Sequence, residues 1–99
     1  MIQYLVEIDL PAILTQEMME TIPEHRAKVS LWMNRGVILS YTLAADRSRL
    51  WIMLVGESEA DADRVIQSLP LVDYFVDIRI HALMFHDTVV TPITQISLN

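Results

Sequence analysis

The chain has 99 residues, of which 53% are hydrophobic, with a formal net charge of -6 and no cysteine. This length suffices for one domain, and so apolar a composition predicts burial of surplus surface between the subunits of a homo-oligomer, at least a dimer. The acidic charge argues against a nucleic-acid partner because no basic stripe could neutralise phosphates, and the lack of cysteine excludes disulfides and cysteine-rich zinc sites.

The sequence shows no pattern typical of a membrane span or of a signal peptide. No apolar run reaches the roughly 18 residues that a membrane span requires. The opening residues Met1-Ile2-Gln3-Tyr4 lack the basic region of a signal peptide. We therefore expect a cytoplasmic protein with no membrane partner.

The first third of the chain predicts a strand followed by a helix. Apolar residues alternate with polar ones over residues 2–9, which is typical of a strand. From Thr15 to Asn34 the apolar residues recur at spacings of three and four, which indicates one apolar helix face. Pro23 predicts an interruption, and Thr21 with Glu24 resembles a capping box at which the helix restarts or kinks. Gly36 is expected just past the helix end.

The middle of the chain predicts a hairpin and a second helix. Residues 37–45 and 49–55 are rich in β-branched and large apolar residues, and a polar turn joins them. Ser58 can cap the helix that follows, and the acids of its first turn suit the helix dipole. Its inner face consists of Ala62, Val65, Ile66 and Leu69.

The last third of the sequence, from Pro70 onward, predicts a fourth strand and a C-terminal tail. Pro70 ends the second helix, and residues 76–85 alternate with period two. We assign residues 1–88 to one domain. Residues 89–99 are too apolar for a plain disordered end, and we expect this tail to pack on a neighbouring subunit.

The element order is strand, helix, strand, strand, helix, strand. This is the ferredoxin-like βαββαβ arrangement, an α+β fold with one four-stranded antiparallel sheet and both helices on one face. The other face would carry apolar residues such as Trp51 and Met53. Face-to-face packing of two such sheets would bury them.

One stretch of the sequence resembles a known family. Leu69-Pro70-Leu71, Tyr74, Asp77-Ile78, Ile80, Leu83 and His86 resemble a motif of the muconolactone delta-isomerases, which are dimeric α+β-barrel proteins of aromatic-compound catabolism. The resemblance covers roughly residues 2–88 and implies transfer of a proton across the allylic system of a small unsaturated lactone, without metal or organic cofactor. Such a reaction needs a base and a donor facing the dienolate oxygen.

The resemblance also suggests site residues. His86 corresponds to a histidine of the family, and His25-Arg26 stands where the family has an acid-base pair, so His86 and His25 are the candidate catalytic residues. Arg26, Tyr74 and Glu7 are the candidate substrate-binding residues. The alternative for His25-Arg26 is a solvated helix face, and the alternative for His86 is a bond to a backbone carbonyl. Residues 37–43 lack the Trp, Arg and His cluster that the family has there.

Other polar and aromatic residues have less specific interpretations. Glu7, Asp77 and Arg79 are expected to form a charged row across the first and fourth strands, which would help strand pairing. His81 and His86 fall on opposite faces of a strand, so we predict no metal site. A set of four aromatic residues could line an apolar cleft or belong to the core: Tyr41, Trp51, Tyr74 and Phe75.

The sequence therefore supports several functions. The leading hypothesis is an isomerase-like enzyme for a small lactone or related acid, with a site between the first helix and the sheet near His25, Arg26, Tyr74 and His86. The first alternative is a binding or assembly protein that has lost the chemistry. The second is another α+β-barrel enzyme that uses a His-Asp pair.

Overall fold

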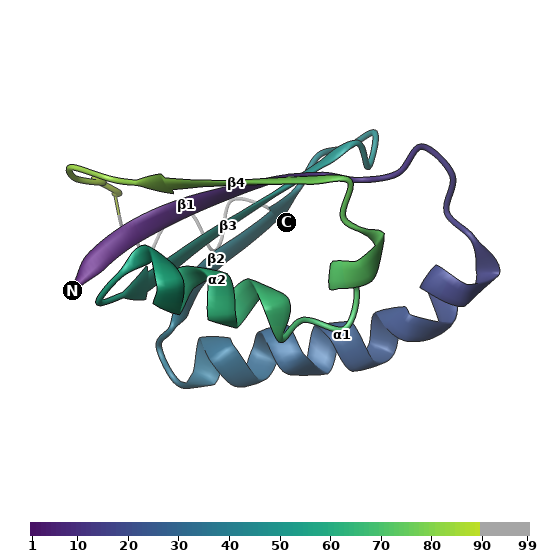
Figure 1. Ribbon diagram of the computed structural model, residues 1–99, viewed down its shortest axis with the longest axis horizontal. Helices are drawn as coiled ribbons and strands as arrows, with labels where there is room; N and C mark the ends of the chain where they lie inside the picture. The colour runs from purple at the N-terminus through teal and green to yellow at the C-terminus, as the bar shows by residue number, and fades with distance from the viewer. Residues whose placement is uncertain (90–99) are drawn as a thin grey trace.

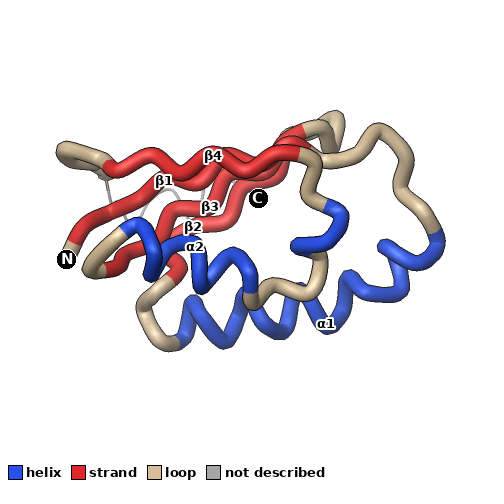
Figure 2. Tube along the Cα trace, in the orientation of Figure 1, coloured by secondary structure: helices blue, strands red, loops and turns tan. Residues whose placement is uncertain are grey.

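A computed structural model describes residues 1–89 and has the predicted α+β architecture. The strands and helices follow one another as β1 (Ile2–Asp9), α1 (Gln16–Asn34), β2 (Ile38–Leu43), β3 (Arg49–Gly56), α2 (Glu59–Gln67), a 3-10 turn η1 (Val72–Tyr74) and β4 (Asp77–Ala82). The strands form one antiparallel sheet in the order β2-β3-β1-β4. Both helices lie on the same side of the sheet (Figure 1), and Figure 2 shows the same two layers coloured by secondary structure.

Helix α1 begins as the sequence predicts but is not interrupted. The Met18 backbone N–H donates to Thr15 Oγ1 at 3.2 Å, which satisfies one free amide of the first turn. The expected restart at Thr21 is wrong, because a single helix contains Pro23 and the Thr21 hydroxyl donates to the Glu17 carbonyl at 2.9 Å. Proline removes one backbone bond and crowds the preceding turn, and the turns on either side remain helical here.

The end of α1 confirms the prediction for Gly36. This residue has φ +74°, which a residue without Cβ adopts without strain. The Gly36 N–H donates to the Met33 carbonyl at 2.9 Å, and the Val37 N–H donates to the Trp32 carbonyl at 3.0 Å. These two bonds form a Schellman motif, which ends α1 and leads into β2.

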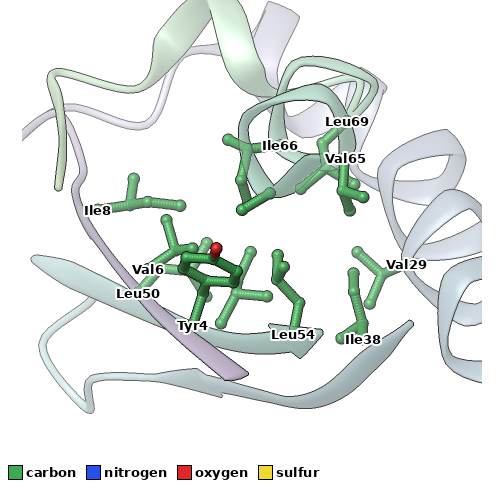
Figure 3. Packing of buried hydrophobic residues seen from close by; sticks show 12 residues of the cluster. Tyr4, Val6, Ile8, Val29, Ile38, Leu50, Leu54, Val65, Ile66 and Leu69 are labelled. Atoms are coloured by element: carbon green, nitrogen blue, oxygen red, sulfur yellow. The ribbon is translucent and has the colours of Figure 1, made fainter. Parts of the chain in front are cut away.

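The inner face of the sheet forms the core with the two helices. The alternation predicted for β1 is confirmed, because Tyr4, Val6 and Ile8 are all buried. Figure 3 shows side chains of the sheet facing those of the helices. The other buried members of this cluster are Val29, Ile38, Leu50, Ile52, Leu54, Ala62, Val65, Ile66 and Leu69.

The connection from α2 to β4 differs in detail from the prediction. The stretch after Pro70, where a turn is expected, contains the 3-10 turn η1, and β4 covers only residues 77–82 of the predicted 76–85. The Val76 N–H donates to the Asp9 carbonyl and the Leu83 N–H to the Gln3 carbonyl, both at 2.9 Å, so pairing with β1 is complete at each end. Residues 90–99, nearly all of the predicted tail, lie outside the described residues.

Candidate functional site

His25 is the buried polar side chain of the described core. It projects from α1, is only 2% exposed, and burial lowers its pKa to about 4. Its Nε2 atom lies 2.8 Å from the Tyr41 hydroxyl oxygen, and its Nδ1 atom accepts a hydrogen bond from the Leu71 N–H at 3.3 Å. At neutral pH the ring is therefore an uncharged imidazole with both nitrogens in contact with partners.

Aromatic groups surround this imidazole. The ring centroids of His25 and Tyr41 are 5.8 Å apart, and Phe75 presents its ring edge-on at 6.4 Å. Leu71 and Phe75 flank η1, so this turn brings both residues to the histidine. Three segments that are distant in sequence, α1, β2 and the turn before β4, thus meet at His25. Its hydrogen bonds lie beside the hydrophobic core.

A β-bulge explains why Tyr41 reaches His25. Ile38 pairs with Leu54 and Ser40 with Met53, so Leu39 is an extra residue in β2. Simple alternation from Ile38 would direct Tyr41 to the face of the sheet away from the helices. The extra residue reverses the faces beyond it, and Tyr41 lies opposite Ile52 on the helix side.

The residues of the site range from buried to exposed. Tyr41 is half-buried on edge strand β2, and Arg26, next to His25, is exposed. Burial raises the pKa of Tyr41 to about 12, and the positive charge of nearby Arg26 opposes that rise. The phenol therefore stays protonated at neutral pH with a cation nearby, which suits the binding of an anionic oxygen.

Tyr74 lies in η1, at the same end of the sheet as the Leu71 contact. Its side chain is half-buried. Partial burial and the nearby Glu17 carboxylate raise the pKa of its hydroxyl. Tyr74 thus approaches the first turns of α1, whereas Arg26 and His25 lie further along that helix.

His86 is not brought to this site. It is exposed and lies beyond the end of β4, whereas His25 contacts residues that precede β4. His86 lines an open hollow of about 500 Å³, whose other lining residues are Met1, Ile2, Gln3, Val55, Leu83, Met84 and Phe85. The two candidate catalytic histidines therefore occupy opposite ends of β4.

A second hollow lies on the helix side of the sheet near α2. It measures about 440 Å³ and is lined by Met1, Trp32, Val37, Val55, Gly56, Glu57, Asp61, Arg64, Val65 and Ser68. The Trp32 Nε1–H donates to the Ser68 hydroxyl at 2.9 Å, and Ser68 donates to the Val65 carbonyl at 2.6 Å. Because these polar groups bond one another, they join α1 to α2.

Glu7 lies on the face of the sheet away from the helices, opposite to His25. The predicted row across β1 and β4 is confirmed, since Arg79 binds Glu7 Oε1 at 3.2 Å and also bonds Asp77. Asp9 and Arg49 extend the row: Asp9 Oδ1 lies 3.0 Å from both arginines. Hydrogen bonds from Arg79 hold the pKa of Glu7 and of Asp9 below the ordinary values, and these carboxylates raise the pKa of Arg79.

Sequence reasoning identified His25 but not its partner. Tyr41 was considered only as one of four aromatic residues of a cleft or core. The bulge that turns it inward has no marker such as glycine or proline within β2, so alternation alone gives the wrong face. The one available signal is composition, because the run 37–43 is apolar except for Ser40, Tyr41 and Thr42.

Comparison with known proteins gives a likeness of fold. No protein-family model and no curated protein matches the sequence. Among solved structures, the chain is similar to the 5-chloro-2-hydroxyhydroquinone dehydrochlorinase TftG from Burkholderia phenoliruptrix AC1100, in complex with 2,5-dihydroxybenzoquinone. The TM-score is 0.64 at 14% identity, over 80% of this chain and 90% of that chain.

The helices of the described residues were also compared with the length and hydropathy of a membrane span. No helix within residues 1–89 is long and apolar enough to cross a membrane. The likeness to TftG extends over most of both chains, and at this identity it is a likeness of fold alone. The strand order, the position of both helices on one side of the sheet and the likeness to TftG together show that the chain is an α+β protein with the ferredoxin-like fold.

Proposed function

We propose that this protein transfers a proton within a small unsaturated lactone or a related acid of aromatic-compound catabolism, at the site formed by His25 and Tyr41. A base removes a proton from the allylic carbon, and the C–H electrons form the new C=C bond of a dienolate. Negative charge then rests on the carbonyl oxygen. Return of the proton at the far end of the conjugated system restores the C=O bond and moves the double bond.

The observation that carries this proposal is the neutral imidazole-phenol pair, in which the histidine is buried and the tyrosine is half-buried. The Nε2 to hydroxyl distance is 2.8 Å, and the histidine is 2% exposed. A hydrogen-bond donor held in a water-poor place stabilises a developing oxyanion without reorganisation, and removing one such donor typically lowers kcat by about 10²–10³-fold. Exposed Arg26 beside it supplies a cation for the substrate's carboxylate.

Two histidines are the candidate bases: His25 lies within the site, and His86, which the motif resemblance suggests, lies at the far end of β4 and reaches only a ligand bound there. A ring whose pKa is about 4 accepts protons poorly at neutral pH, which disfavours His25 for this role. His86 is exposed and borders the open hollow at the other end of β4. The variant His86→Gln therefore tests whether His86 is the base, separately from the role of the His25–Tyr41 pair.

A binding protein without chemistry is the second candidate function. It is favoured by the separation of His86 and His25 along β4 and by the absence of a charged residue from the described β2 segment. The likeness to TftG, which was solved with a small quinone, supports a small-molecule ligand for this chain in either case.

The deciding experiment measures conversion of muconolactone by the parent protein and three variants. We expect turnover in the parent, a loss of roughly 10²-fold or more in kcat for His25→Leu, and a loss of roughly 10²–10⁴-fold for His86→Gln. The control His81→Gln, on the face away from the helices, should keep the parent rate. A parent that binds muconolactone without converting it would favour the binding protein, and full activity of His86→Gln would remove His86 from the mechanism.

A further inference from the structure

The hydrogen bonds around His25 have a direction that fixes its tautomer. A backbone N–H can only donate, so the Leu71 N–H at 3.3 Å requires a lone pair on Nδ1. In the neutral ring the proton must then be on Nε2. This Nε2–H donates to the Tyr41 oxygen at 2.8 Å.

The same directions leave the Tyr41 proton available. A phenol oxygen that accepts the Nε2–H bond does not donate along it, so its own O–H is directed elsewhere. The hydroxyl lies in a half-buried position near exposed Arg26. A donor whose oxygen already accepts a hydrogen bond is polarised and donates more strongly.

We infer that the Tyr41 hydroxyl donates a hydrogen bond to the anionic oxygen of the bound ligand, and that His25 is the positioning residue that holds this hydroxyl in its donating orientation. The inference rests on the proposed function and names the ligand class of the same site: flat, unsaturated anions with charge on one ring-bound oxygen. Tyr41 touches the ligand, whereas His25 acts through Tyr41.

The first test reads the tautomer without any ligand. In the full chain labelled with ¹⁵N-histidine, long-range proton-nitrogen spectra at pH 7 should show His25 with a protonated Nε2 and an unprotonated Nδ1. The opposite tautomer, or a doubly protonated ring, would overturn the assignment. Tyr41→Phe should shift the Nε2 resonance and leave the Nδ1 resonance nearly unchanged.

The second test uses 4-nitrophenolate, a coloured flat anion whose phenolate oxygen shares the negative charge with the nitro group. We expect the parent protein to bind it and Tyr41→Phe to bind it about tenfold or more weakly, as for loss of one bond to a charged group. Ser40→Ala, on the same strand and the other face, is the matched control and should bind like the parent. Absence of binding by the parent, or equal binding by Tyr41→Phe, would overturn the inference.

Substitutions of His25 separate positioning from base catalysis. Glutamine can donate to Tyr41 from its amide nitrogen and accept from Leu71 with its oxygen, whereas leucine can do neither. His25→Gln should therefore bind 4-nitrophenolate within about threefold of the parent, and His25→Leu should lose about tenfold or more. Equal losses in both variants would refute the positioning role. A parent that binds the phenolate but converts no lactone would refute the proposed function and leave this inference standing.

Discussion

The Nε2 atom of His25 lies 2.8 Å from the hydroxyl oxygen of Tyr41, although the two residues are 16 positions apart and belong to a helix and an edge strand. The contact depends on the bulge at Leu39, which directs Tyr41 to the helix side of the sheet. It also depends on the turn before β4, which supplies the Leu71 N–H. The geometry of the His25–Tyr41 pair therefore depends on α1, on the bulge in β2 and on the turn before β4.

Stability should fall between about pH 6.5 and pH 4 because of His25. Burial lowers its pKa from 6.5 to about 4, so in this interval the unfolded chain binds a proton that the folded chain does not. Stability is complete above pH 6.5 and decreases as pH falls, by roughly 3 kcal/mol at pH 4, given about 1.4 kcal/mol per pKa unit. Urea denaturation at a series of pH values measures it. His25→Gln should flatten the slope in this interval, and an unchanged slope would contradict the buried neutral ring.

The carboxylates of the sheet face away from the helices should titrate higher without Arg79. Hydrogen bonds from Arg79 lower the pKa of Glu7 and Asp9, which are two residues apart on the same face of β1. In Arg79→Gln both pKa values should rise, as measured by ¹³C NMR of the side-chain carboxyls. Arg64→Gln, which removes the ion pair to Asp61 instead, is the control and should leave Glu7 and Asp9 unaffected. Unmoved values in Arg79→Gln would show that the charged row is not formed in solution.

Replacing Gly36 should destabilise the fold through backbone conformation alone. Its φ of +74° disfavours a residue with a Cβ, and no atom lies within 4 Å of where that Cβ would be. Gly36→Ala should therefore lower the free energy of unfolding by about 1 kcal/mol, and Gly36→Asn by less. Urea denaturation gives both values. Equal stability of the alanine variant and the parent would mean that the α1 end differs from the Schellman motif.

The sheet face opposite the helices should mediate self-association. Leu5, Trp51, Met53 and Val55 alternate with the core residues of β1 and β3 and so lie opposite the helices. Burial of apolar area between two such faces favours a dimer. Sedimentation at micromolar concentration should give a species heavier than the single-chain mass of 11.4 kDa.

A charge on that face provides the matched test of the dimer. Leu5→Glu should shift sedimentation toward the single chain, whereas Leu31→Glu, on the exposed side of α1, should not. A parent that sediments only as a single chain would refute the dimer. Dissociation by Leu31→Glu alone would assign the contact to the helices.

Local patterns in the sequence were sufficient to predict most of the fold. Tyr4, Val6 and Ile8 alternate strictly, so the buried face of β1 follows from period two. Gly36 and Ser58 mark a helix end and a helix start through their own conformational and hydrogen-bonding preferences, and both predictions are confirmed. Pro23 misled because its local preference was outweighed by the helical turns and packing around it.

The candidate site could be predicted only in part, since it is made by contacts distant in sequence. The row of Arg79 and Glu7 could be expected because the element order makes β1 and β4 neighbours in the sheet. Tyr41 could not be assigned to His25, because one extra residue in β2 reverses its face and leaves no local signal. The roles of Arg26, Tyr74 and Glu7 stay predictions, and the variants above test the roles of His25 and His86.

Loss of label from the allylic carbon tests the central claim most directly. Muconolactone deuterated at that carbon is incubated with the parent protein and with Tyr41→Phe, and NMR follows the label and the product. Deuterium should leave the allylic carbon as the double bond moves, and the rate should fall by about 10²–10³-fold in Tyr41→Phe through loss of the oxyanion donor. Retention of the label with the parent protein, or its loss at the same rate with Tyr41→Phe, would contradict proton transfer at the His25–Tyr41 site.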